Sequence, residues 1–176
     1  DDDGRSIERA GRVVDPGSFV RGADGEVVDD DQRDGEYTRA LGRRLAAAYP
    51  QLTVLHATSV VARAVYDQLA QAAGTRDIYR LLRAPSTDLS VEAVATVAAI
   101  ERLRQRFLAT PSAGALHPAI AGLSAAEILD DAIRGFGTYH RRPIASRRGD
   151  RIIVGDLQLL YYYQNRTSHL KPEGPA

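Results

Sequence analysis

Four histidines are the side chains of this chain best suited to proton transfer or metal binding, and their spacing suits neither task. They are His56, His117, His140 and His169. None is followed five residues later by an aspartate, and none belongs to a His-Glu-x-x-His pair or another metal-spaced cluster. A histidine near the end of a helix commonly caps the helix or stays partly exposed. We expect this structural role for each of the four.

Other residue patterns that carry chemistry are missing from the sequence. It has no Gly-rich phosphate-binding loop, no G-x-S-x-G nucleophile elbow and no cysteine. The adjacent acids Asp130 and Asp131 would point about 100° apart on a helix, so they would not converge on one substrate atom. The run Asp29-Asp30-Asp31 suits solvation or helix capping better than a cation site. We therefore assign no catalytic, cofactor-binding or metal-binding residue.

Charge is unevenly distributed along a chain whose formal net charge is zero. Residues 1–36 hold twelve acids and five arginines, a balance of −7. Residues 134–151 hold six arginines and only one acid, Asp150, a balance of +5. A basic stretch can attract phosphates or anionic lipid, and it can also be an ordinary solvated hairpin. Both interpretations stay open at this point.

Three successive tyrosines, Tyr161-Tyr162-Tyr163, form a second conspicuous stretch. On a helix they would cover most of its circumference. Rings with one polar tip suit either core packing with a hydrogen bond or a membrane interface. We expect core packing.

Apolar periodicity predicts six helices separated by short breaks. The second should bury Val61, Ala64, Val65, Leu69 and Ala72. Pro50 should stop the first helix, Gly74 suits the end of the second, and Ser90 is a plausible N-cap for the fourth. The expected helices cover residues 32–49, 58–73, 77–83 and 90–109, a fifth that follows Ser124 and includes Phe136, and residues 157–169.

The end of the chain changes from helical to strand-like period. Residues 143–146 and 151–154 flank Arg147-Arg148-Gly149-Asp150, which is a hairpin signal. Ser124-Ala-Ala-Glu127 is a capping box, and Asp156 suits the cap of the last helix. That helix is apolar nearly all round, so we expect other elements to clasp it.

The predicted fold class is mainly α, a helical bundle-like domain with one C-terminal β-hairpin and an extended acidic N-terminal arm. We expect residues 1–30 to form that arm, with at most a loose hairpin around Ala23 to Glu26, and to leave an upstream catalytic domain. Residues 31–110 should form a helical region. Residues 111–176 should form a helix, hairpin and helix subdomain that is winged-helix-like.

The sequence contains no methionine and begins with Asp1-Asp2-Asp3, so we expect a fragment or a processed piece. No apolar run approaches the length of about 20 residues that crosses a bilayer, and no signal peptide pattern is present.

Three stretches resemble the C-terminal half of the bacterial glycerol-3-phosphate acyltransferase family, which is related to dihydroxyacetone-phosphate acyltransferases. The first is the most specific: Asp1-Asp-Asp-Gly-Arg-Ser-Ile7, Gly11-Arg-Val-Val-Asp15, Gly25-Glu-Val-Val-Asp-Asp-Asp-Gln-Arg-Asp34 and Glu36-Tyr-Thr-Arg39. The second is Thr53-Val-Leu-His-Ala-Thr-Ser-Val-Val-Ala62 with Asp77-Ile-Tyr-Arg-Leu-Leu-Arg83. The third is Leu159-Leu-Tyr-Tyr-Tyr-Gln-Asn-Arg166 with His169-Leu170.

The resemblance implies the C-terminal auxiliary region of an enzyme that transfers an acyl group from acyl-CoA or acyl carrier protein to glycerol-3-phosphate in phospholipid synthesis. The family's His-x-x-x-x-Asp motif supplies a general base, and this chain lacks it. We expect the motif upstream, in the same polypeptide, and this chain alone to be inactive. The implied location is cytoplasmic and peripheral to the inner membrane. An anionic membrane surface is a further partner that this location suggests. The family often has a histidine near the position of Ser59, whereas here it is His56.

Two hypotheses of other functional classes compete with the acyltransferase hypothesis. Residues 90–155 resemble a winged helix, in which a helix enters the major groove and the wing touches phosphate. The wing arginines fit that module, whereas Asp130 and Asp131 on the recognition helix would repel phosphates, so we do not expect nucleic acid as a partner. The third reading is a purely structural interaction domain.

Overall fold

The computed structural model describes residues 7–9, 12–14, 31–83, 85, 89–109, 115–138 and 140–169. These residues form seven α-helices and a three-stranded antiparallel sheet, so the prediction of a mainly α fold with a C-terminal hairpin is confirmed. The chain divides into two compact units, Asp1–Pro50 and Gln51–Ala176. Within the described ranges, no helix combines the length and the apolar character needed to cross a membrane.

The first unit contains a short strand pair and most of a long helix. Strands β1 (Ile7–Arg9) and β2 (Arg12–Val14) pair antiparallel. The loose hairpin predicted around Ala23 to Glu26 lies outside the described residues. Helix α2 (Asp31–Leu52) confirms the first predicted helix, but the prediction that Pro50 stops it is wrong. A proline removes its own N–H and leaves the amides of the next two residues able to continue the helical bonding.

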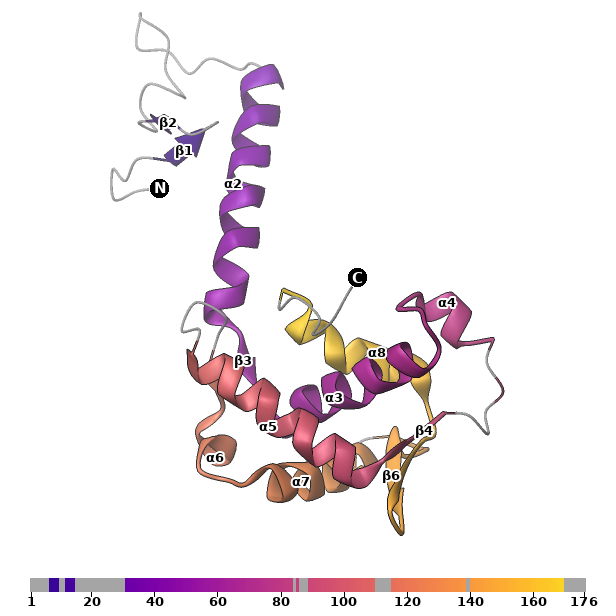
Figure 1. Ribbon diagram of the computed structural model, residues 1–176. Coiled ribbons are helices and arrows are strands. Elements are labelled where there is room, and N and C mark those ends of the chain that lie inside the picture. Colours follow the sequence, from indigo (N-terminus) through magenta and orange to yellow (C-terminus); the bar gives the residue numbers. More distant parts are fainter. Residues whose placement is uncertain are drawn as a thin grey trace, which may run out of the picture. The chain divides into compact units, whose positions relative to one another are not determined.

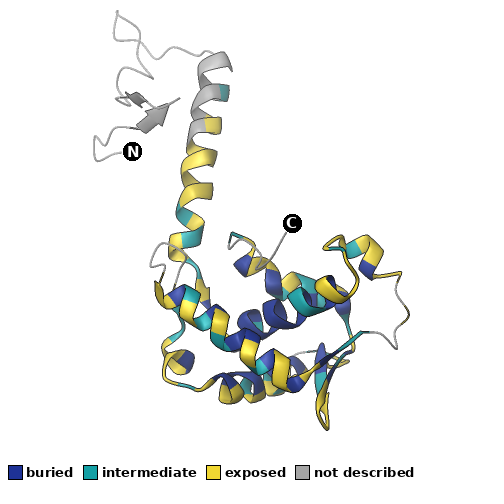
Figure 2. Ribbon diagram, viewed as in Figure 1, coloured by how far each residue is buried: buried dark blue, intermediate teal, exposed yellow. Residues whose placement is uncertain are grey.

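Helix α3 (Ala57–Ala72) is the central helix of the second unit, and it is buried on nearly all sides in its first half (Figure 2). The predicted stripe is confirmed except for Ala72, which is exposed in the last turn. The helix ends as predicted at Gly74, whose positive φ of 62° closes the turn without the steric cost that a Cβ would add. Helix α4 (Ile78–Leu81) follows, capped by the Asp77 side chain.

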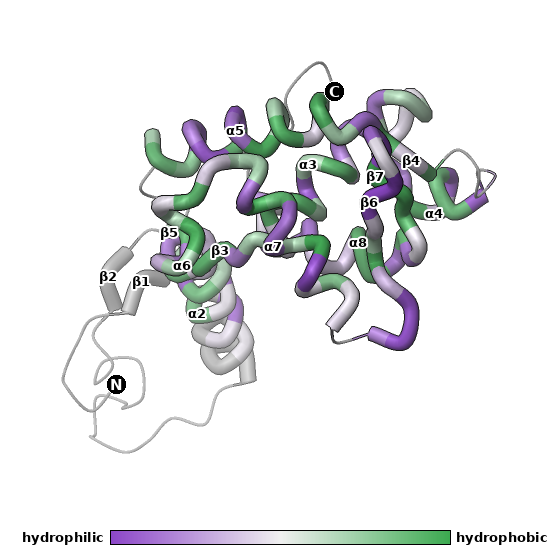
Figure 3. Tube along the Cα trace, turned by 90° about the horizontal axis from the view of Figure 1, so that it is seen from below, coloured by the Kyte–Doolittle hydropathy of each residue, from purple (hydrophilic) through white to green (hydrophobic). Residues whose placement is uncertain are grey.

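Three further helices pack against α3 (Figure 1). They are α5 (Ala93–Ala109), α7 (Ala125–Thr138) and α8 (Leu157–Gln164), the last continued by the 3-10 turn Asn165–Thr167. Figure 3 shows hydrophobic and hydrophilic residues alternating along α5, as expected of a helix with one buried face. Ile100, Leu103 and Phe107 form that face. The short helix α6 (Pro118–Ala121) lies between α5 and α7 in the sequence.

The antiparallel sheet has the strand order β4-β7-β6. Its strands are β4 (Ser90–Glu92), β6 (Ala145–Arg148) and β7 (Arg151–Val154). Strands β6 and β7 are the predicted hairpin, and Gly149 in its turn has a φ of 61°. The N-cap predicted at Ser90 is wrong, because Ser90 pairs with Ile153 in the sheet and α5 begins three residues later.

A second small pairing ties distant parts of the same unit together. Strand β3 (Val54–Leu55) runs parallel to β5 (Ala115–Leu116), and its partner residues lie about 60 positions apart in the chain. The N–H of His117 donates to the Leu55 carbonyl over 2.9 Å.

Both predicted caps in the C-terminal part are confirmed. The Ser124 backbone N–H donates to Glu127 Oε2 over 2.8 Å, and the Glu127 N–H donates back to Ser124 Oγ over 3.3 Å. Asp156 Oδ1 accepts from the Leu159 N–H over 2.9 Å. Helix α8 packs against α3 as expected of an apolar helix, but other elements do not cover it all round, because Tyr162 is 65% exposed.

The second unit includes helices from both of the regions predicted as residues 31–110 and 111–176. Helix α7 packs on α3 and on α5 within this unit. The division into residues 31–110 and 111–176 as separate regions, and the arm over residues 1–30, stay predictions.

Candidate functional site

The parallel strands β3 and β5 bring two of the four histidines together. His56 and His117 each follow one of these strands directly, and their rings stack with centroids 4.5 Å apart. His117 Nδ1 accepts from the Ala119 N–H over 3.2 Å, which caps α6. His56 occupies the N-cap position of α3 and makes no side-chain capping bond there. Sequence reasoning had no means to pair these residues, because strands of two residues leave almost no periodic signal.

The surroundings of His56 disfavour its protonation. Partial burial lowers the pKa of His56, and the positive charges of His117 and Arg166 lower it further. Elsewhere, His140 Nε2 lies 3.2 Å from the Tyr163 hydroxyl. Over the described part of the chain, no three His, Asp or Glu side chains lie close enough together to hold a metal ion.

The surface proposed to face nucleic acid in the winged-helix reading is internally paired. Arg147 of the hairpin lies 3.6 Å from Asp130 of α7, measured from Nη1 to Oδ1. Arg134 lies 3.0 Å from Asp131 on the same helix. The two acids singled out in the sequence therefore partner the neighbouring arginines, and the positive charge of the hairpin is partly neutralised before any ligand arrives.

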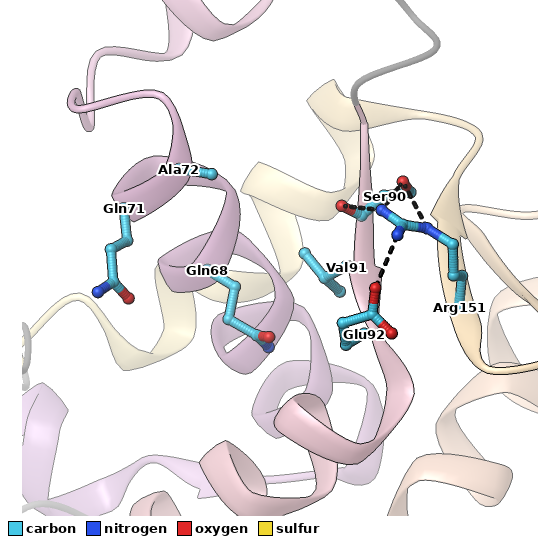
Figure 4. Close-up of a pocket in the computed structure, with 7 residues that line it drawn as sticks. All are labelled: Gln68, Gln71, Ala72, Ser90, Val91, Glu92 and Arg151. Carbon is cyan, nitrogen blue, oxygen red and sulfur yellow. Dashed lines mark hydrogen bonds and ion pairs between the residues drawn. The ribbon is translucent and has the colours of Figure 1, made fainter.

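A surface hollow of about 310 Å³ lies between the C-terminal half of α3 and strand β4 (Figure 4). Among the described residues that line it, Arg151 is the only cationic side chain, and its guanidinium donates to Ser90 Oγ over 2.6 Å and to Glu92 Oε1 over 2.7 Å. Across the hollow, the Gln68 amide donates to the Ala64 carbonyl and to Thr96 Oγ1. The hollow is lined by Gln68, Gln71, Ala72, Ser90, Val91, Glu92 and Arg151.

The described lining of this hollow lacks the arrangement that catalysis requires. Nucleophilic attack by Ser90 would need a general base within hydrogen-bond reach of its hydroxyl, and that oxygen instead accepts from the Arg151 guanidinium, which is a donor and cannot act as a base. The Arg151 contacts join β7 to β4 and stabilise the edge of the sheet. We read the hollow as structural.

The tyrosine run divides between core and surface. The Tyr161 ring lies 5.4 Å from that of Tyr66, and the Tyr163 ring lies 5.8 Å from that of Phe136. Both tyrosines pack against the core, as expected. Tyr162 points to the surface, so the run is not wholly a core element.

Helix α2 exposes apolar side chains along one face. Leu41 and Leu45 in the first unit are 39% and 51% exposed. At about 100° per residue these positions fall within about 40° of one another around the helix. An amphipathic helix normally buries this face, so α2 presents a surface suited to a partner. We call Leu41 and Leu45 the α2 apolar face.

The sequence did not predict one buried, charged side chain. Arg63 lies on α3 with its side chain only 2% exposed, and its Nη1 donates to the Thr167 carbonyl over 2.8 Å. The bond joins α3 to the 3-10 turn that follows α8. The available signal was Asp67, four residues later, which pairs with Arg63 Nε over 2.7 Å.

No protein-family model, no curated protein and no solved structure matches this chain.

Proposed function

We propose that this chain is the C-terminal auxiliary region of a glycerol-3-phosphate acyltransferase-like enzyme. Its role is to pack against the catalytic domain of the same, longer polypeptide. In the whole enzyme the substrates are acyl-CoA or acyl carrier protein and glycerol-3-phosphate, and the enzyme lies at the cytoplasmic side of the inner membrane. The catalytic base belongs to the upstream domain.

The observation that carries the docking role is the α2 apolar face. Burying a leucine side chain fully contributes about 1.5–3 kcal/mol. The exposed parts of Leu41 and Leu45 together equal about one whole side chain. Covering them with a partner would therefore contribute about 2 kcal/mol, which favours a fixed position of this helix.

The packing of the second unit supports the same proposal. Two stretches that carry the family resemblance contribute the first six residues of α3 and most of α8, and these helices lie against each other. A region with helices packed in this way has a core of its own and can serve as a scaffold for the proposed catalytic domain. The sequence does not contain the His-x-x-x-x-Asp spacing of the family.

The test uses the longer polypeptide with its upstream segment restored. We expect it to transfer acyl groups from acyl-CoA to glycerol-3-phosphate. The double variant Leu41→Asp, Leu45→Asp should lower that activity at least tenfold, because it charges the α2 apolar face. The matched control, Ala46→Asp with Ala47→Asp, adds the same charges to the opposite side of α2 and should retain activity. Absence of acyl transfer in the unsubstituted longer polypeptide rejects the assignment.

A nucleic-acid-binding winged helix is the second candidate, and the chain connectivity favours it. Helix α5, the capped helix α7 and the hairpin β6–β7 follow one another in the expected order, and β4 adds a third strand beside β7. The pairs Arg147–Asp130 and Arg134–Asp131 weigh against it, because they reduce the attraction for phosphate.

The two candidates separate in a DNA mobility-shift assay at low and at physiological salt. A salt-dependent shift that is lost in the variant Arg147→Ala, Arg148→Ala supports the nucleic-acid candidate. No shift at low salt disposes of it.

A further inference from the structure

A second, smaller hollow lies where α3, α8 and the 3-10 turn meet. Its volume is about 190 Å³, below the range of about 300–1,000 Å³ that holds drug-sized ligands. A hollow of this size has room for a small ion or for one group of a larger molecule. It is lined by Arg63, Tyr66, Arg76, Tyr161, Gln164, Asn165 and Ser168.

The lining carries two cations that share one carboxylate. Asp67 Oδ2 accepts from Arg63 Nε over 2.7 Å, and Asp67 Oδ1 accepts from Arg76 Nη2 over 2.5 Å. Each oxygen of Asp67 thus bonds to one guanidinium, and this triad keeps a net charge of +1. Because Arg63 is buried, its field is weakly screened by water and reaches into the hollow.

Two contacts with Tyr66 set the position of Arg76. The Tyr66 hydroxyl donates to the Arg76 carbonyl over 2.5 Å, and the Arg76 guanidinium carbon lies 5.6 Å from the centre of the Tyr66 ring. Burial raises the pKa of Tyr66, and the neighbouring Tyr161 raises it further, so this hydroxyl stays protonated and adds no negative charge. A guanidinium held in this way loses little freedom when it binds a ligand.

Uncharged polar groups complete the lining. Gln164 donates through Nε2 to Asn165 Oδ1 over 2.8 Å, which orients the Asn165 amide, and Ser168 adds a hydroxyl. Amide and hydroxyl donors beside arginine are the groups that bind phosphate oxygens. No carboxylate lines this hollow among the described residues.

We infer that this hollow, named here the Arg63–Arg76 pocket, binds a phosphate group, either as free phosphate or as a phosphomonoester head group. The Arg76 guanidinium and the wall formed by Asn165 and Ser168 contact its oxygens, and the buried Arg63 supplies the attracting field. The inference stands independently of the acyltransferase proposal, because it uses only the charge and shape of this pocket.

The test is a titration of the chain with inorganic phosphate, followed by amide chemical shifts and matched for ionic strength with chloride. We expect saturable shifts at residues 63–67, 76 and 164–168. Arg76→Gln should weaken the apparent Kd about tenfold, since it removes a charged donor. Arg80→Gln removes the same charge from a highly exposed side chain outside the pocket and should change the Kd less than twofold.

Vesicles distinguish the two sources of the phosphate group. Vesicles of phosphatidylcholine with phosphatidic acid are compared with phosphatidylcholine alone. If Arg76→Gln abolishes binding to the acidic vesicles and Arg80→Gln preserves it, the ligand is a lipid head group. This assignment holds even if free phosphate gives no shift. Saturable binding of free phosphate without vesicle binding assigns a soluble ligand. Absence of both, or equal losses in the two variants, overturns the inference.

Discussion

Replacing Arg63 is the most demanding test of how the second unit is held together. Arg63 Nη1 donates to the Thr167 carbonyl over 2.8 Å and lies 3.3 Å from Thr167 Oγ1. Thr167 is fully buried, so water cannot replace these bonds without a rearrangement of the 3-10 turn. Asp67 keeps a second partner in Arg76, and it therefore does not become an isolated charge in the variants.

The magnitude follows from these contacts. Arg63→Met keeps the length and apolar body of the side chain but leaves the Thr167 carbonyl without its charged donor, which costs about 1–3 kcal/mol. We expect a loss of about 2 kcal/mol in the free energy of unfolding. Arg63→Ala also leaves a void against α8, so its loss should reach about 4 kcal/mol.

Urea unfolding followed by far-UV circular dichroism measures both values at one pH. The control Arg83→Met removes an exposed arginine and should lie within about 0.5 kcal/mol of the unsubstituted chain. If Arg63→Met were as stable as this control, the buried bond to Thr167 would contribute nothing and the reasoning would be refuted.

Three further predictions concern local structure and pH. Gly155→Ala should destabilise the chain by more than 1 kcal/mol in the same urea assay, because a Cβ there collides with the Pro143 carbonyl oxygen; a neutral result would contradict the close approach. Ser124→Ala should lower the free energy of unfolding by about 1 kcal/mol at neutral pH. The Ser124 hydroxyl and amide bonds lower the pKa of Glu127, so this difference should shrink as the pH falls below the ordinary glutamate value of about 4.3, and a pH-independent difference would speak against the capping box. The pKa of His56 is lowered in the folded chain, so the unfolded chain takes up a proton first as pH falls through about 6.5. Stability should therefore decrease from pH 7 to pH 5, and His56→Asn should flatten that slope; an unchanged slope would show that His56 is not its source.

Local sequence rules predicted the parts of the fold that local contacts determine. The capping box at Ser124, the cap at Asp156 and the hairpin turn at Gly149 all depend on residues within four positions of one another, and all three are confirmed. Most of the buried stripe of α3 was equally predictable from its period.

The errors arose where distant pairing overrides a local preference. Ser90 has the chemistry of an N-cap, but its backbone gains a ladder with Ile153 of β7, more than sixty residues away. The stacking of His56 on His117 depends on the parallel pair β3–β5 in the same way. The sequence did not predict the Arg63–Arg76 pocket either. An arginine on a helix is expected at the surface, and Arg63 becomes buried only because α8 covers it.

The division of labour between this chain and an upstream catalytic domain is the central claim. The direct measurement compares release of CoA thiol from acyl-CoA, with glycerol-3-phosphate present, by this chain of 176 residues and by the longer polypeptide. The account predicts glycerol-3-phosphate-dependent release by the longer polypeptide and none above background by the chain alone. Turnover by the chain alone would contradict it.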